Sequence, residues 1–289
     1  MDLIVTEGIE KRFGQLTALR DISLRVRRGE LYGLIGPDGA GKTTFFRILT
    51  TLMLPDGGRA TVDDLDIATD YRRIRAAVGY MPGRFSLYPD LTVKENLEFF
   101  ATLFGTRLED NYDLIRDIYV QIEPFRSRRA GRLSGGMKQK LALCCALIHR
   151  PRVLFLDEPT TGVDVVSRHE FWDMLSGLKQ QGITMLVSTP YMDEAVRCDR
   201  IALIQSGRLL SIDTPRGIIE NYPDALFEVR AENMRQLTDE IRKRCSPRSC
   251  FASGRSLHVS FSRDDAEAPQ RMRAALTAAG CTNLEIAPI

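Results

Sequence analysis

The sequence has no long apolar run, which excludes a membrane-spanning segment within it. No stretch of the 289 residues approaches the ~20 consecutive apolar residues that a transmembrane helix needs. The beginning, residues 1–6, has no basic segment followed by an apolar one, so we expect no signal peptide. Forty basic and 38 acidic residues leave a net charge of +2, which gives no reason to expect a nucleic-acid partner.

The cysteines are few and lack a recognisable pattern. Of the six, Cys144 and Cys145 are adjacent, and Cys245 and Cys250 have no second pair of ligands nearby. We therefore expect reduced thiols and a cytoplasmic protein rather than a disulfide framework or a metal site. Hydrophobic residues make up 44% of the chain, which is ordinary for a globular protein. At 289 residues the chain can bury one large core, or one large core plus a small second domain.

A glycine-rich motif lies between an expected strand, Leu31–Ile35, and an expected helix. Residues 36–43 fit the pattern G-x-x-x-x-G-K-[ST], in which glycines allow backbone amides to approach oxyanions. The start of the following helix adds a partial positive charge. Lys42 can contact the β- and γ-phosphates of ATP, and Thr43 can ligate Mg²⁺. The predicted ATP-binding residues of this motif are Gly36, Pro37, Asp38, Gly39, Ala40, Gly41, Lys42, Thr43 and Thr44.

A second short apolar run, residues 153–156, ends in two acidic residues. The run is too short for a helix and suits a strand of a parallel sheet, so Asp157 and Glu158 fall at the sheet edge where ligands bind. We predict that Asp157, with Thr43, holds Mg²⁺ and that Glu158 is the catalytic residue that activates water. A solvated acidic turn is the alternative, and the phosphate-binding motif upstream argues against it.

A third motif stands at the start of an expected helix, where a serine cap and two glycines can bind an anion. Its residues are Leu133, Ser134, Gly135, Gly136, Met137, Lys138 and Gln139. We call these seven residues the signature. The three motifs, in this order, resemble those of the ATP-binding subunit of ABC transporters, and the resemblance covers roughly residues 3–215. The resemblance implies that two such domains close head to tail around two ATP molecules, the signature of one facing the phosphate loop of the other.

The resemblance also assigns single positions. Phe13 matches the family's aromatic that stacks on adenine, although a core phenylalanine at a strand end is the alternative. Asp164 falls in the family's D-loop, which crosses the dimer interface. Two positions depart from the pattern: Gly83 stands where the family has a glutamine near Mg²⁺, and Pro190 stands where it has a histidine that contacts the γ-phosphate. We therefore expect slow hydrolysis at this chain's own site, in either a homodimer or an asymmetric heterodimer.

The predicted fold is α/β: a P-loop ATPase with a mixed sheet, a helical subdomain and a small C-terminal ferredoxin-like α+β domain. We place the ATP-binding domain at 1–217, with the helical subdomain at about 84–150 and a candidate capping box at Thr92 and Glu95. Residues 218–289 follow a βαββαβ order, with helices expected at 234–244 and 269–279. The apolar residues ahead of the helical subdomain either form a groove for a partner's helix or pack that subdomain: Phe85, Leu87, Tyr88 and Leu91.

The leading functional prediction is an ATP-hydrolysing subunit that powers a membrane exporter. It would work with a separate transmembrane permease at the inner face of the membrane. The alternatives are a soluble ABC protein of translation, a DNA-repair ATPase, and a nucleotide-sensing module with little hydrolysis. One copy of each motif counts against the first of these, and the short gap between Thr44 and Leu133 counts against a coiled-coil insertion. The missing glutamine and histidine keep the sensing module open.

Overall fold

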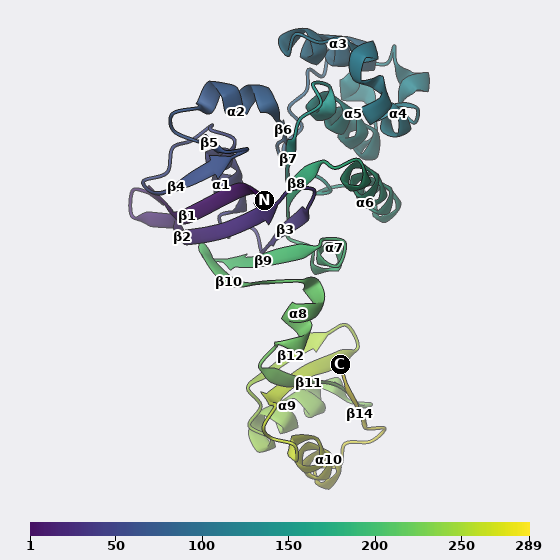
Figure 1. Ribbon diagram of the computed structural model, residues 1–289. Helices are drawn as coiled ribbons and strands as arrows, with labels where there is room; N and C mark the ends of the chain where they lie inside the picture. Colours follow the sequence, from purple (N-terminus) through teal and green to yellow (C-terminus); the bar gives the residue numbers. More distant parts are fainter. The chain divides into compact units, whose positions relative to one another are not determined.

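The computed structural model describes residues 1–289, which divide into two compact units, Met1–Ile218 and Ile219–Ile289 (Figure 1). Each unit has a hydrophobic core of its own. No helix in either unit combines the length and the apolar character that crossing a membrane requires.

The first unit opens with a four-stranded antiparallel sheet in the order β2-β1-β4-β5. Its strands are β1 (Asp2–Phe13), β2 (Leu16–Arg27), β4 (Gly57–Val62) and β5 (Leu65–Asp66). The first two strands are long, because the hairpin pairing continues through register shifts until Phe13 lies opposite Leu16. Gly14, at a φ of 57°, makes the turn between them.

The central sheet has six strands in the order β10-β9-β3-β8-β7-β6. They are β3 (Leu31–Ile35), β6 (Val78–Met81), β7 (Val153–Asp157), β8 (Thr184–Thr189), β9 (Arg200–Gln205) and β10 (Arg208–Asp213). All pairs are parallel except the β9–β10 hairpin, which confirms the predicted mixed sheet. Because β3, β8 and β7 are parallel neighbours, their carboxyl ends meet at one edge.

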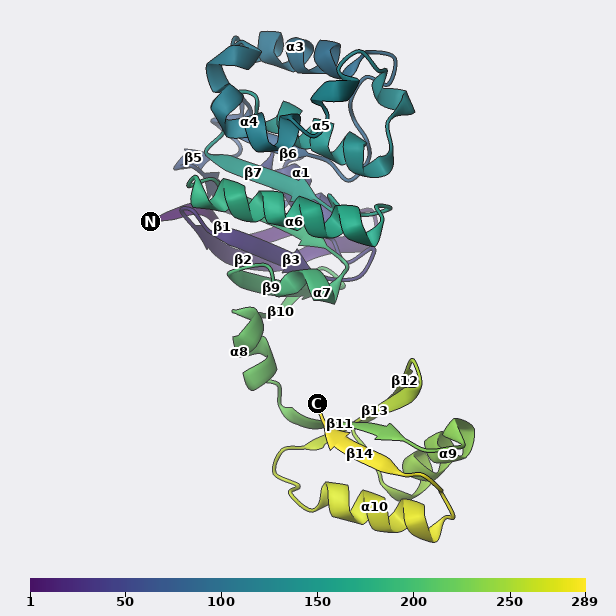
Figure 2. The same cartoon turned by 90° about the vertical axis from the view of Figure 1, so that its right-hand side faces the viewer.

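Helices cover both faces of this sheet. Phe155 of β7 packs with α1 (Lys42–Leu49) in one core, whereas Leu154 and Leu156 of the same strand pack with α5 (Gly135–Leu147) and α6 (Val165–Gln180) in the other. Figure 2 shows α6 lying along the sheet beside β7. Side chains alternate across a strand, so one apolar run supplies both cores.

The helical subdomain, which we placed at about 84–150, consists of short helices and turns rather than long continuous helices. It contains α3 (Val93–Leu103), α4 (Tyr112–Tyr119) and short 3₁₀ turns at Leu108–Asn111, Glu123–Phe125 and Ala130–Arg132. The chain leaves α3 through Gly105, at a φ of 67°. The predicted capping box is confirmed: Thr92 N donates to Glu95 at 2.7 Å, and Glu95 N donates to Thr92 Oγ1 at 3.2 Å.

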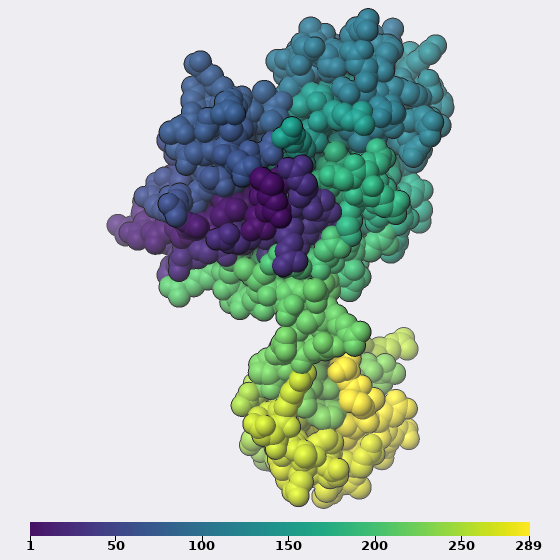
Figure 3. All heavy atoms as spheres, viewed as in Figure 1, coloured from purple at the N-terminus to yellow at the C-terminus, as the bar shows by residue number.

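Segments far apart in the sequence lie side by side in this unit. In Figure 3 the purple N-terminal strands lie against green segments from the end of the unit. One such contact joins Arg20 N to the carbonyl oxygen of Gly207 at 2.7 Å. The remaining helices are α2 (Tyr71–Ala77) and α7 (Met192–Ala195). Helix α8 (Pro215–Glu220) spans the boundary between the two units.

The second unit has the predicted βαββαβ order. Its elements are β11 (Asp224–Arg230), α9 (Met234–Arg244), β12 (Ser249–Ser253), β13 (Ser256–Ser262), α10 (Ala268–Ala278) and β14 (Glu285–Pro288). The antiparallel sheet runs β12-β13-β11-β14, which is the ferredoxin-like arrangement. One apolar face carries the two helices, with Val229, Leu257 and Val259 packed against Leu237 and Met272.

Candidate active site

The glycine-rich loop joins β3 to α1 at the edge where the parallel strands end. A Cβ on Gly36 would lie 2.1 Å from the carbonyl oxygen of Ile204, and one on Gly41 would lie 2.6 Å from that of Ala18. Gly41 also has a φ of 105°, which side-chain-bearing residues rarely adopt. The loop is therefore held closely between β9 and β2, and its backbone forms the kind of concavity that binds anions.

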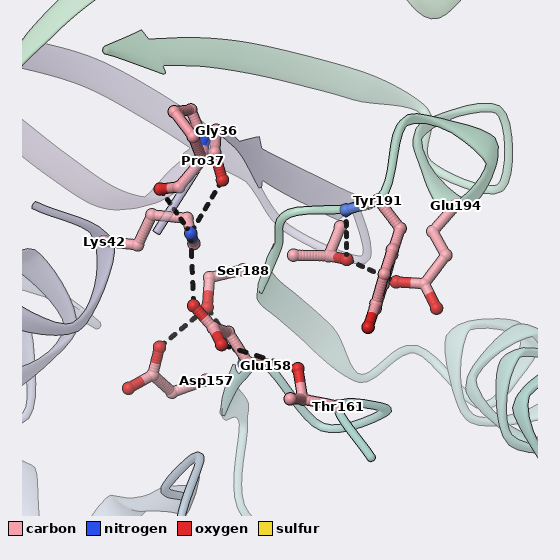
Figure 4. Close-up of polar contacts among 10 residues, drawn as sticks. Gly36, Pro37, Lys42, Asp157, Glu158, Thr161, Ser188, Tyr191 and Glu194 are labelled. Atoms are coloured by element: carbon pink, nitrogen blue, oxygen red, sulfur yellow. Dashed lines mark hydrogen bonds and ion pairs between the residues drawn. The ribbon is translucent and has the colours of Figure 1, made fainter. Parts of the chain in front are cut away.

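Lys42, the first residue of α1, folds back over this loop (Figure 4). The residue is 3% exposed. Its Nζ donates to the carbonyl oxygens of Gly36 at 2.7 Å and Pro37 at 2.9 Å. The third neighbour is Glu158, whose Oε1 lies 3.1 Å away as an ion pair. The ammonium is thus held over the loop by groups that a phosphate could replace.

Asp157 lies at the end of β7, buried, and accepts a hydrogen bond from Ser188 Oγ at 2.7 Å. Burial raises the pKa of this carboxyl, against the hydrogen bonds from Ser188 and Thr43, which lower it. Thr43 and Asp157, the two predicted Mg²⁺ ligands, are therefore neighbours. Burial, helped by the charge of Asp157, also raises the pKa of the nearby Tyr80 to about 12.

Glu158 has a φ of 51°, in the left-handed region that non-glycine residues seldom occupy. Its backbone N–H donates to Ser188 twice, to Oγ at 2.9 Å and to the carbonyl oxygen at 3.1 Å. Such conformations persist only where the surroundings impose them. Sequence reasoning could not place Ser188. The structure shows that it holds both acidic residues.

A cleft of about 450 Å³ opens beside this loop. It is lined by the loop and Glu158 on one side and on the other by Phe13, Leu16, Thr17, Ala18, Arg20, Ser206 and Gly207. Phe13 is 46% exposed, so the alternative of a core phenylalanine is wrong. We did not predict that residues 16–18 and Arg20 line this cleft. The only signal in the sequence is that they continue the hairpin that contains Phe13.

The two departures from the family pattern have different structural settings. A Cβ on Gly83 would lie 2.9 Å from the carbonyl oxygen of Asp157, so the backbone passes β7 with no space for a side chain. Pro190 directly follows β8 and brings no polar group. His149 does not substitute for the missing histidine. Its ring stacks on Phe104, with 3.8 Å between the ring centroids, and its Nε2 lies 3.1 Å from the carbonyl oxygen of Val78.

The signature lies against the start of α6. Ser134 caps α5 as predicted, accepting from Met137 N at 3.4 Å. A Cβ on Gly136 would lie 2.7 Å from Ser167 Oγ. Ser167 N in turn donates to Asp164 Oδ1 at 3.0 Å, which caps α6. None of the signature residues lines the cleft that contains Lys42.

These features suit a magnesium-bound nucleoside triphosphate. The backbone of the loop packs so closely at Gly36 and Gly41 that a Cβ would not fit, and Lys42 above it is buried. The hydroxyl of Thr43 and the carboxylate of Asp157 lie together, and Mg²⁺ prefers oxygen ligands of this kind. Such a loop between a parallel strand and a helix, with an acidic pair at a nearby strand end, defines a P-loop nucleoside triphosphatase.

Comparison with known proteins narrows this class. Residues 19–161 match the family described as ABC transporter. The probable multidrug ABC transporter ATP-binding protein YbhF of Escherichia coli (strain K12) is 40% identical over 215 residues, covering 74% of this chain and 37% of that protein. The Nod factor export ATP-binding protein I of Burkholderia lata is 38% identical over 238 residues, covering 81% of this chain and 78% of that protein.

Among solved structures, the dimeric bacterial ABC transporter cassette MJ0796 is 26% identical, with a TM-score of 0.66, covering 74% of this chain and 99% of that one. The same cassette has been solved in a post-hydrolysis state bound to ADP and Pi. The chain therefore belongs to the family of ABC transporter ATP-binding proteins. It spans 37% of the length of YbhF, so the partners and substrates of that longer protein do not transfer directly.

Proposed function

We propose that this ATP-binding subunit powers export through a separate membrane permease, by closing as a dimer around ATP. The observation that carries the proposal is the meeting of Lys42, Asp157 and Glu158 at one sheet edge, with an intact signature elsewhere on the same unit. The relative named for Nod factor export supports the direction of transport.

Within the site, residues 36–44 receive the phosphates and the exposed ring of Phe13 stacks on the adenine. Thr43 and Asp157 would hold Mg²⁺, which neutralises phosphate charge when bound. Glu158 leaves Lys42 when phosphates take its place, and its carboxylate then orients the attacking water and accepts a proton from it.

Hydrolysis at this site is slow in our proposal, because two side chains of the family pattern are missing. Gly83 offers no ligand, and a Cβ at this position would lie only 2.9 Å from the carbonyl oxygen of Asp157. Pro190 offers no imidazole. Both groups normally act at the γ-phosphate end, so their loss affects turnover more than nucleotide binding.

The signature serves a partner's nucleotide. Ser134 and the first amides of α5 form a capped helix start, where an anion is stabilised. This helix start packs on α6 at Ser167, next to Asp164 of the D-loop. We propose a head-to-tail dimer with a second copy or with a related cassette, in which this pair of motifs faces the other subunit.

A separate apolar groove fits the permease. It has a volume of about 180 Å³ and lies between the central sheet and the helical subdomain, lined by residues that include Leu52, Tyr80, Leu87, Phe100 and Phe104. Phe85 and Tyr88 are exposed on the segment that leads into the subdomain, at 40% and 47%. We propose that a helix of the permease docks there and holds the subunit at the inner face of the membrane.

The test is the steady-state ATPase rate of the purified chain with and without a co-expressed permease. We expect slow turnover that Glu158→Gln abolishes while nucleotide binding persists. Asp117→Asn, a change at an exposed carboxylate of α4, is the matched control. Nucleotide binding with no turnover that depends on Glu158 would favour the alternative, a nucleotide-sensing module. Failure to bind nucleotide at all would refute both.

A further inference from the structure

A buried carboxylate that the proposed mechanism does not use binds two threonines near the acidic pair in sequence and sheet order. Glu194, in α7, is 3% exposed. Its Oε1 accepts a hydrogen bond from Thr160 Oγ1 at 2.7 Å, and its Oε2 accepts one from Thr189 Oγ1 at 2.5 Å. Both threonines are 1% exposed, so neither hydroxyl can exchange its partner for bulk water. Figure 4 shows Glu194 next to Tyr191.

The two threonines belong to the two segments that shape the catalytic end of the sheet. Thr160 follows Glu158 by two residues, in the turn that leads to the D-loop. Thr189 is the last residue of β8 and follows Ser188, which holds Asp157 and Glu158. We call the hydrogen-bonded set Thr160–Glu194–Thr189 the carboxylate strap. It connects the turn after Glu158 to the end of β8 through one side chain.

The strap is anchored to α6 as well. Arg168 Nε lies 3.9 Å from Glu194 Oε1, and its Nη2 binds Asp193 at 3.2 Å. The same guanidinium lies 4.5 Å from the ring of Tyr191, directly after Pro190. A buried carboxylate costs free energy unless donors and a counter-charge satisfy it, and here both are present. Charge-assisted hydrogen bonds of this kind are short and fix their donors in place.

We propose that Glu194 is a positioning residue, which holds Glu158 in its left-handed conformation by tying the turn after it to the end of β8. This inference rests on the proposed function, in which Glu158 activates water. The segment after β8 lacks a histidine at position 190, so the strap, rather than a side chain that contacts the nucleotide, sets how this segment and Glu158 lie relative to each other. Glu194 itself touches neither nucleotide nor water in this role.

The first test needs no nucleotide. Hydrogen–deuterium exchange over residues 158–164 reports on the turn, where Thr161 N donates to Glu158 and Val163 N to Thr160, both at 3.2 Å. We expect Glu194→Ala to raise exchange in this segment by about tenfold or more, and Asp117→Asn, a change at an exposed carboxylate of α4, to leave it unchanged. Equal exchange in the wild type and Glu194→Ala would overturn the proposal.

The second test separates turnover from binding. Glu194→Ala should lower kcat by about ten- to a hundredfold, because a small misplacement of the catalytic group is costly, while KM for ATP changes by less than about threefold. Thr160→Ser and Thr189→Ser keep the hydroxyls and should retain the rate, whereas Thr160→Val and Thr189→Val should lose it. If Glu194→Ala does not fold, these threonine pairs decide the question alone.

The outcomes distinguish the two proposals. Absence of turnover that depends on Glu158 in the wild type counts against the proposed function, and the exchange experiment then still decides whether the strap exists. Normal kcat in the valine variants, in a protein whose turnover Glu158→Gln abolishes, overturns the strap while leaving the proposed function intact. A parallel loss of kcat and nucleotide affinity would also overturn it, because it indicates a general structural role.

Discussion

The close contact between the signature and α6 predicts that alanine substitutions at the neighbouring glycines Gly135 and Gly136 change the stability of the protein differently. A Cβ on Gly136 would lie 2.7 Å from Ser167 Oγ and 2.9 Å from Ser167 Cβ, whereas one on Gly135 meets only the carbonyl oxygen of Gly162 at 3.7 Å. The Ser167 hydroxyl can rotate away, but its Cβ cannot. Gly136→Ala therefore forces α5 and α6 apart, and Gly135→Ala does not.

The magnitude follows from two opposing effects. Overfilling a packed contact costs about 1–3 kcal/mol. Replacing glycine by alanine in a helix returns up to about 1 kcal/mol at either position. The second effect cancels in the comparison, so Gly136→Ala should be about 1–3 kcal/mol less stable than Gly135→Ala. For a unit of this size that difference corresponds to about 2–12 °C in Tm.

The assay uses the single tryptophan of the chain. Trp172 is buried in α6, so its fluorescence follows unfolding of the first unit, and the second unit is silent. Ser167→Gly removes both atoms that would clash. In that background the stabilities of Gly136→Ala and Gly135→Ala should differ by less than about 1 kcal/mol, which a double-mutant cycle measures. Equal stabilities of the two alanine variants in the wild-type background, or no rescue by Ser167→Gly, would refute the reasoning.

Two further predictions concern the acidic edge of the sheet. Pro190→His should raise the ATPase rate if the missing imidazole limits turnover, whereas Pro190→Ala, which removes the ring and adds no polar group, should give no such rise; an equal rate in both would contradict it. Asp157→Asn should raise the Tm of the nucleotide-free, magnesium-free protein at pH 8. Because burial raises the pKa of Asp157 in the folded protein, its ionisation costs stability above that pKa, and the cost disappears as pH falls below the unfolded value of about 3.9. The gain from asparagine should therefore shrink by pH 4, and a loss of stability at pH 8 would refute the assignment.

Local chemistry in the sequence predicts much of this fold. Glycine spacing and flanking apolar runs placed the phosphate loop between β3 and α1, and the capping box at Thr92 was confirmed. The same reasoning predicted α9 with its observed bounds, Met234–Arg244, because its cap and apolar spacing lie within the segment itself. These features depend on neighbours in sequence, which a pattern records directly.

Contacts between distant segments could not be predicted in this way. The restriction at Gly83 comes from the backbone of Asp157, and the role of Ser188 comes from the pairing of β7 with β8. The carboxylate strap joins Thr160 to Glu194 across 34 positions of sequence. Such contacts follow from the sheet order, and no periodicity in any one segment encodes them.

The most direct test of the account is the mass of the nucleotide-bound protein in solution. With Glu158→Gln blocking hydrolysis, ATP should convert the chain from monomer to dimer, either alone or mixed with a related cassette from the same transporter. Ser134→Arg, which places a bulky cation at the signature, should prevent this in the chain that carries it. A protein that binds ATP with Glu158→Gln yet remains monomeric in both settings would contradict the central claim that ATP joins two such subunits.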